Sequence, residues 1–394
     1  MFFLSERKKV LLGVLTVVIL FSFLVTGTVV GLVISNYDHL GRLVKVVALI
    51  KSDYLHSVTP TQLVDGAMKG MVDALDDKYS LYLDPTENKH MFEVIEGRFG
   101  GVGIVLSLKD ENHLSVLKPI KNSPADRAGI KPGDAIIKID DVDTSTITQD
   151  KAVSLMRGKE GTKVTLGIYR ESEKKILTFP ITREAINIPT VEGEILPGTK
   201  DIAYINISQF SSETDKELDQ VWKDIVQKNP KGVILDLRYD HGGELNAAVN
   251  VAGYFVPKGP AVYIVDKYGK TEAKNPTKNN YLGIPLVVLV NEESASASEI
   301  VAGAIKDNKS GTLVGTKTFG KGVVQTIYQL DGGAGIKLTT AKYLTPNKND
   351  INQKGIEPDV KVELGKGQTV VQPPYELKDF DDQVKKALEE LKSK

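Results

Sequence analysis

Continuous apolar runs in the second half of the chain constrain its fold most strongly. Residues 202–207, 232–237 and 285–290 consist mainly of aliphatic side chains. Such runs are expected for strands of a sheet that is covered on both faces. Together with the intervening helical stretches they predict an α/β domain over residues 184–365. Its further strands are predicted at 312–315, 323–330 and 335–343, and its helices at 213–227, 245–254 and 296–306.

Residues 97–183 have a different character. Short β-rich runs alternate there with Gly, Pro and Asp turns, and a single helical stretch lies at 149–156, so we predict a small, mostly β domain. Its opening, FGGVGIVL from Phe99, places three glycines before a strand. Their backbone amides could hold the carboxylate of a peptide C-terminus. A plain turn explains these glycines equally well.

The N-terminus carries a long uncharged run. Arg7, Lys8 and Lys9 precede residues 10–34, in which bulky apolar side chains dominate. The run is long enough to cross a bilayer, and its basic flank predicts a cytoplasmic N-terminus with the rest of the chain outside the cytoplasm. We therefore expect a transmembrane signal anchor in the cell membrane. The alternative is a cleaved signal peptide.

Two helical regions flank the predicted domains. Residues 37–96 show apolar positions at helical spacing, interrupted by DDKYSLYLDP at 76–85, which we interpret as a packing loop rather than a site. After a linker at 366–374, residues 375–394 form a charged helix with Val384, Leu388 and Leu391 on one side. Such a helix packs on the surface or serves as a partner helix, so homo-oligomerisation stays open.

Charge and cysteine content exclude several kinds of site. The 50 basic and 51 acidic side chains leave a net charge of −1, so no overall field favours nucleic acid as a partner. The chain has no cysteine, which excludes disulfides, a thiol nucleophile and a cysteine-ligated zinc site. The lack of cysteine also fits an exported protein.

A serine cluster is the first candidate for chemistry. The segment PLVVLVNEESASASEIVAGAIKD predicts a strand, a polar turn and a helix, with Ser296 at the start of the helix. Unpaired amides and the helix dipole at that point can stabilise the oxyanion of an acyl transfer. The structural alternative is helix capping by Ser296, completed by Glu299 as a capping box.

A serine nucleophile needs a base, and the sequence offers two. His241, in LRYDHGGEL with Asp240 before it, is the histidine best placed to compete. Lys321 lies between two glycines in KTFGKGVVQ, and Gln325 follows at i+4, where it could hold the lysine amine. A lysine acts as a base if burial or a nearby cation lowers its pKa from about 10.4 toward neutrality. A solvated surface charge is the alternative for Lys321.

Four motifs in order carry a family resemblance. LDLRxxxGG, SASASEIVAGAIKD, VGTKTFGKGVVQ and LTTAKYLTPNKNDINQKGIEPDV resemble the carboxy-terminal processing peptidases, serine peptidases of family S41, and SPADRAGIKPGD resembles their PDZ domain. The resemblance implies Ser296 as nucleophile, Lys321 as base and Gln325 beside it. It also implies a catalytic domain of the ClpP/crotonase type and a groove for polypeptide C-termini at Gly100, Gly101, Val102 and Gly103.

The oxyanion-hole motif departs from the family. The usual LRxNPGG is LRYDHGG here, with Asp240 and His241 in place of Asn and Pro. We expect the amides of Gly242 and Ala297 to form the hole, with Gly243 as the replacement for Gly242. The predicted function is a serine endopeptidase that needs neither metal nor cofactor, with control by PDZ movement or a regulatory protein left open. A silent membrane scaffold and a crotonase-like acyl-CoA enzyme remain as alternatives.

Overall fold

The structure is a computed structural model that describes residues 15–17, 19–23, 26–27, 37–106, 114–370 and 380–393. The chain divides into two compact units, Met1–Asp76 and Asp77–Lys394. In the first unit, helix α2 spans Tyr37–Asp53 and α3 spans Pro60–Asp73. Thr59 begins α3 with a capping box, because its side chain accepts from the Gln62 amide while the Gln62 side chain accepts from the Thr59 amide.

The predicted transmembrane helix over residues 10–34 is corrected by the structure. A membrane span needs about 20 consecutive apolar helical residues. Within the described ranges, no helix has both the length and the apolarity for such a span. Residues 15–17, 19–23 and 26–27 of the run are described as short helical pieces, and the remaining positions of the run lie outside the described residues. The location outside the cytoplasm stays a prediction.

The second unit contains the predicted α/β domain. Its main sheet has the strand order β10-β11-β12-β15-β16-β19, in which β10 is antiparallel to β11 and the other neighbours are parallel. The strands are β10 (Val191–Ile195), β11 (Ile202–Ile207), β12 (Gly232–Asp236), β15 (Leu286–Val290), β16 (Thr312–Gly315) and β19 (Val360–Lys361). All residues of β12 and β15 are buried, as their continuous apolar runs predict.

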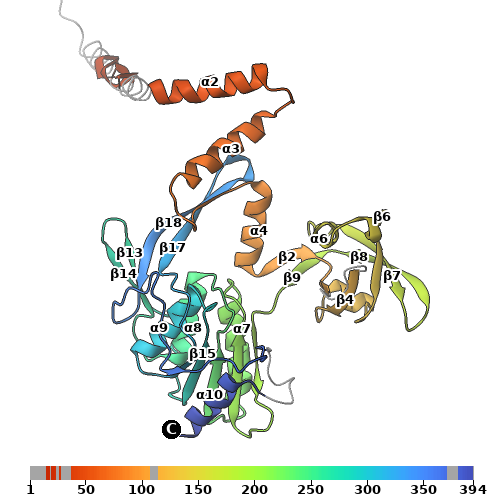
Figure 1. Cartoon of the computed structure of the whole chain (residues 1–394), viewed down its shortest axis with the longest axis vertical. Coiled ribbons are helices and arrows are strands. Elements are labelled where there is room, and N and C mark those ends of the chain that lie inside the picture. Colours follow the sequence, from red (N-terminus) through yellow and green to blue (C-terminus); the bar gives the residue numbers. More distant parts are fainter. Residues whose placement is uncertain are drawn as a thin grey trace, which may run out of the picture. The chain divides into compact units, whose positions relative to one another are not determined.

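Helices cover both faces of this sheet (Figure 1). Three of them share one hydrophobic core: α7 (Thr214–Val226), α8 (Leu245–Phe255) and α9 (Ala297–Asp307). The C-terminal helix α10 (Asp382–Lys392) packs on the opposite face. There Val384 and Leu391 share a core with the strand residues that point to this face, such as Ile234 and Val287. The C-terminal helix is thus a packed part of the domain.

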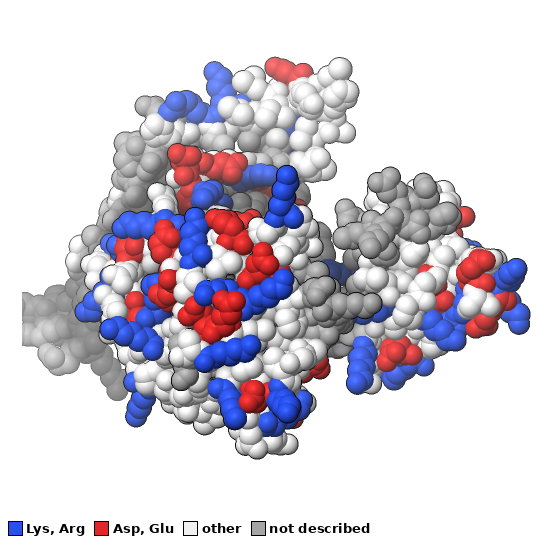
Figure 2. Space-filling view, turned by 60° about the horizontal axis from the view of Figure 1, so that its bottom comes forward, with Lys and Arg blue, Asp and Glu red and all other residues white. Residues whose placement is uncertain are grey.

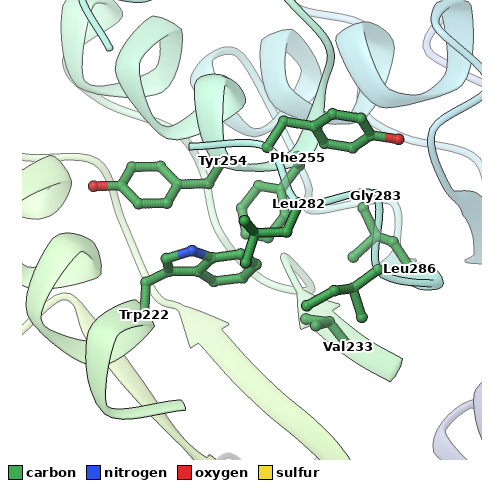
Figure 3. Close-up of a pocket in the computed structure, with 9 residues that line it drawn as sticks. Trp222, Val233, Tyr254, Phe255, Leu282, Gly283 and Leu286 are labelled. Carbon is green, nitrogen blue, oxygen red and sulfur yellow. The ribbon is translucent and has the colours of Figure 1, made fainter. Parts of the chain in front are cut away.

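Aromatic side chains fill the core between α7 and α8. The ring of Trp222 meets those of Tyr254 and Phe255 edge-on, with centroids 5.7 Å and 5.5 Å apart (Figure 3). Beside them, Val233 and Leu286 line a gap of about 10 Å³, no larger than one water molecule. This region is packed core rather than a ligand site.

A second sheet has the order β1-β18-β13-β14, with β17 also paired to β18. These strands are β1 (Leu81–Leu83), β13 (Val262–Asp266), β14 (Thr271–Lys274), β17 (Val323–Gln329) and β18 (Gly335–Leu344). Because β1 precedes the PDZ-like region and pairs with β18 after it, the PDZ-like region is an insertion in this unit. We predicted residues 76–85 to be a packing loop, but they also contain strand β1.

The PDZ-like region is mostly β, as predicted. Its sheet has the order β3-β4-β5-β7-β8 with β6 paired to β5, and the pair β2-β9 joins it to the rest of the unit. The strands are β2 (Arg98–Gly101), β3 (Ile104–Leu106), β4 (Leu114–Pro119), β5 (Ala135–Ile139), β6 (Val142–Asp143), β7 (Lys163–Arg170), β8 (Lys175–Thr182) and β9 (Glu184–Asn187), and the helices are α5 (Pro124–Ala128) and α6 (Gln149–Met156). Helix α4 (Pro85–Glu96) precedes β2.

Charged side chains are mixed on the surface. Figure 2 shows Lys and Arg interspersed with Asp and Glu over the face in view. Many of them form exposed ion pairs, such as Lys216 with Glu213 and Lys223 with Asp219. Pairs of this kind contribute little to stability.

Candidate active site

Ser296 sits on a strained turn between β15 and α9. Its backbone has φ 56° and ψ −111°, a conformation that costs a non-glycine residue about 1–3 kcal/mol. Neighbouring contacts hold the turn in this shape. Ser294 donates to the Leu237 carbonyl at 2.8 Å, and Ser298 donates to the Asp240 carbonyl at 2.9 Å. The outer serines of the motif are therefore structural, whereas Ser296 is half-buried at the edge of a cavity.

Buried Glu299 ties the Ser296 turn to the Lys321 loop. Its Oε2 accepts the backbone N–H groups of Ser296 and Lys321, each at 2.9 Å. Its Oε1 accepts from the Thr318 hydroxyl at 2.6 Å and from the Gly320 amide at 2.8 Å. Four donors satisfy this carboxylate, so it fixes two segments that are far apart in the sequence.

Lys321 lines the same cavity as Ser296. Its Nζ lies 5.0 Å from the ring centroid of Tyr79. Burial lowers the pKa of the Lys321 ammonium below its ordinary value, the positive charge of Lys337 lowers it further, and the Glu299 carboxylate opposes the change. A lysine with this environment has a larger neutral fraction than a solvated one, as a general base requires. No hydrogen bond from its amine to Ser296 or Gln325 is recorded in the part of the chain that the structure describes.

Sequence reasoning missed several residues that the second sheet brings to this cavity. Lys337 of β18 lines it and is half-buried, and Asp77 is its acidic neighbour. Tyr343, also on β18, donates its hydroxyl to the Ser296 carbonyl at 3.0 Å. Asp77 and Tyr79 lie in the segment that we interpreted as a packing loop. No local signal marks them, because the pairing of β1 with β18 depends on the fold.

Gln325 also lines the cavity, next to a β-bulge in β17. Its side chain donates to the Thr339 hydroxyl at 3.5 Å, a weak hydrogen bond. The predicted contact with the Lys321 amine therefore stays a prediction.

The glycines beside Ser296 are packed tightly. Gly242 has φ 91°, and a Cβ there would lie 2.7 Å from the Ala297 nitrogen. The Gly242 amide donates to Asp240 Oδ1 at 2.8 Å. Among the described residues, the amides of Gly243 and Ala297 have no recorded acceptor. The backbone N–H of Gly243 is thus available to an oxyanion, whereas that of Gly242 is already bonded to Asp240. Gly243 is the residue that we named as the replacement for Gly242 in the oxyanion hole.

His241 lines the same cavity as Ser296, but no hydrogen bond joins the two side chains among the described residues. The His241 side chain is 73% exposed, and its Nδ1 lies 3.5 Å from Glu293 Oε2. Asp240 does not support the imidazole either, because its carboxyl group is buried and accepts from the Gly242 amide. The geometry therefore favours Lys321 over His241 as the base.

The shared cavity has a volume of about 600 Å³. Its polar lining residues include Ser296, Lys321 and Lys337, together with His241, Glu244, Asn246, Gln325, Thr326 and Tyr343. Apolar side chains of α4 and of other elements also line it. The apolar members are Met91, Phe92, Val94, Ile95, Leu245, Ile300, Val323, Val324 and Ile327. A cavity of this size and lining suits an extended peptide with apolar side chains.

A second cavity, of about 270 Å³, lies in the PDZ-like region. Strand β3 and helix α6 line it, as do Val102 and Gly103 of the predicted groove. Gly100 and Gly101 of β2 do not line it, although their neighbour Phe99 does. The structure thus brings two of the four predicted residues to this cavity.

The described residues contain no group of three or more His, Cys, Asp or Glu side chains that could hold a metal ion.

Three family descriptions match the chain. "Peptidase family S41" matches residues 201–362, "PDZ domain" matches residues 94–169, and "Activating protease CtpB N-terminal domain" matches residues 29–87. The last match begins inside the run that we predicted to span a membrane.

Curated relatives match over most of the chain. The carboxy-terminal processing protease CtpA of Bacillus subtilis is 41% identical over 331 residues, which cover 84% of this chain and 70% of that protein. The carboxyl-terminal-processing protease of Synechocystis is 39% identical, over 75% of this chain and 70% of that protein. The solved photosystem II D1 C-terminal processing protease is 29% identical over 79% of this chain and 84% of that chain, with a TM-score of 0.45. The chain belongs to the carboxy-terminal processing proteases, serine peptidases of family S41 with a PDZ domain.

Proposed function

We propose that the chain cleaves polypeptides through a dyad in which Ser296 is the nucleophile and Lys321 the general base. The observation that carries this proposal is that both residues line one cavity and that Glu299 fixes their backbones through a single oxygen. The chain's membership of a protease family removes the scaffold and acyl-CoA alternatives.

The proposed reaction proceeds through an acyl-enzyme. Neutral Lys321 takes the proton of the Ser296 hydroxyl as the oxygen attacks the peptide carbonyl, and Lys321 then returns the proton to the leaving amine. The amides of Ala297 and Gly243 stabilise the oxyanion, because the Gly242 amide is occupied by Asp240. Water, activated by the same lysine, releases the second product.

Cleavage of an unstructured polypeptide with an apolar C-terminus by the full chain tests the dyad. The variants are Ser296→Ala, Lys321→Ala and His241→Ala. We expect the first two to lose cleavage and the third to retain it. Loss of cleavage in the His241 variant, with retention in the Lys321 variant, would replace the dyad by the Ser296/His241 pair.

We further propose that the PDZ cavity binds the free C-terminal end of the substrate. The cavity between β3 and α6 is apolar, and the glycine-rich segment before β3 can present amides to a carboxylate. The same polypeptide with a free and with an amidated C-terminus tests this. We expect the amidated polypeptide to have a higher KM than the polypeptide with a free C-terminus. A short peptide that contains only the cleaved sequence should show the same kcat/KM with either C-terminus. Equal KM values for the two polypeptides would exclude recognition of the carboxylate.

A further inference from the structure

Asp240 occupies a position that no catalytic assignment uses. Its side chain is fully buried. Oδ1 accepts the Gly242 amide at 2.8 Å, whereas Oδ2 is buried and has no hydrogen-bond partner among the described residues. The Asp240 carbonyl accepts from the Ala295 amide at 3.0 Å and from the Ser298 hydroxyl at 2.9 Å. Asp240 therefore connects the glycine turn to the turn that carries Ser296.

Within the part of the chain that the structure describes, no cation forms an ion pair with this carboxyl group. Arg238, two residues away, directs its guanidinium to Asp236, Asp381 and Gln383. His241, the next residue, is exposed and lies beside Glu293. The carboxylates on the surrounding elements have partners of their own: Glu244 accepts from the Ala247 amide, Glu292 from the Thr316 hydroxyl, and Glu299 from its four donors. On the neighbouring loop, Lys317 pairs with Glu357 and Lys321 faces the cavity.

A buried carboxylate with one hydrogen bond and no cation is strongly disfavoured, whereas the neutral acid is tolerated. Burial accordingly raises the pKa of Asp240 well above its ordinary value, although the hydrogen bond from the Gly242 amide to the carboxyl group opposes this. The family motif has Asn at this position. A neutral carboxylic acid resembles an Asn amide in offering a C=O acceptor and a donor, although the acid has one O–H where the amide has two N–H donors.

We propose that Asp240 is a positioning residue that supports the oxyanion-hole turn in its protonated form, in place of the family's Asn, and that its ionisation disables the site. An Asp240 carboxylate would place a negative charge behind the turn whose amides must stabilise the oxyanion. The effect falls on the transition state, so kcat decreases while KM stays unchanged. The activity part of this inference rests on the proposed function, since it requires an oxyanion at Ser296.

The two ionisations have opposite effects on the pH profile. Deprotonation of Lys321 produces a rising limb of kcat/KM, and deprotonation of Asp240 produces a falling limb. The Asp240→Asn variant cannot ionise at this position. We expect it to keep the rising limb, to lose the falling limb, and to show a wild-type KM.

Stability provides a readout that does not need activity. A carboxyl group with a raised pKa in the folded state stabilises the fold fully below its unfolded pKa of about 4, and this contribution is lost as the pH rises through the folded pKa. The Tm of Asp240→Asn should therefore exceed that of the parent by an amount that grows with pH above about 4. Both proteins are measured in the Ser296→Ala background, which removes self-cleavage.

The matched control is Asp141→Asn, because the Asp141 side chain is fully exposed. We expect no pH-dependent change in Tm and an unchanged falling limb for this control. A Tm difference between Asp240→Asn and its parent that is constant from pH 4 to pH 9 would overturn the proposal. A falling limb that persists in Asp240→Asn would overturn it as well. If wild type is inactive but the Tm difference grows with pH, the claim that Asp240 is protonated in the folded protein is supported and the proposed function fails instead.

Discussion

The backbone N–H groups of Ser296 and Lys321 donate to the same oxygen atom, Oε2 of Glu299, at 2.9 Å each. The proposed nucleophile and the proposed base are thereby positioned through one carboxylate rather than through a contact of their own side chains. Because Glu299 is buried and accepts four hydrogen bonds, neither loop can shift without losing at least one of them.

The Glu299→Gln variant should lose most activity. An amide has a single acceptor oxygen, so its NH₂ group would face two of the N–H and O–H donors that Glu299 now accepts. We expect kcat/KM to fall by about 10²-fold, an effect of misplaced catalytic groups. Steady-state kinetics measure this, with the exposed Glu272→Gln as control. Equal activity of the two variants would mean that Glu299 does not position the dyad.

The Lys337→Met variant should shift the pH profile of cleavage. The positive charge of Lys337 lowers the pKa of Lys321, and Glu299 opposes it, so removal of the Lys337 charge raises the pKa of Lys321. Less neutral Lys321 is then present at neutral pH, and kcat/KM should fall roughly 3- to 10-fold there and recover at higher pH.

Lys337→Arg is the matched variant because it keeps the positive charge beside Lys321. We expect its rising limb to lie near that of wild type. A rising limb that shifts equally in the Met and Arg variants would show that Lys337 acts by shape rather than by charge.

The Asp381→Ala variant should destabilise the C-terminal helix. Asp381 accepts from the fully buried Arg238 at 2.9 Å and also caps α10 through the Val384 amide at 2.9 Å. Its removal leaves a buried guanidinium short of one carboxylate and removes the cap, so the free energy of unfolding should fall by roughly 3 kcal/mol. Urea denaturation measures the loss, with the exposed Glu389→Ala as control. A loss below that of the control would show that α10 does not depend on Asp381.

Removal of divalent metal should leave cleavage unchanged. In the proposed mechanism the Ser296 hydroxyl, the Lys321 amine and two backbone amides supply all the groups that react or bind charge. Activity is measured before and after dialysis against EDTA, with readdition of Zn²⁺ or Ca²⁺. Inactivation by EDTA that either metal reverses would contradict this mechanism.

The central strands were predictable because each is a local apolar run. The structure has β11 at Ile202–Ile207 and β16 at Thr312–Gly315, with the predicted bounds. The flanking strands β1, β13 and β14 were not predicted. They are short and partly exposed: β14 reads TEAK and has no apolar run, and β1 has only three residues. The apolar run VYIVD of β13 was a local signal that we did not use.

The sequence by itself determined the buried strands, the helix after Ser296, and the residue types Ser296 and Lys321 within long motifs, because these depend on neighbouring residues in the chain. The tertiary structure alone decided which groups surround them. The pairing of β1 with β18 sets Leu81 opposite Lys337, and the packing of α10 brings Asp381 to Arg238. Contacts of this kind depend on strand register and on packing between distant segments, and neither is encoded in a local pattern.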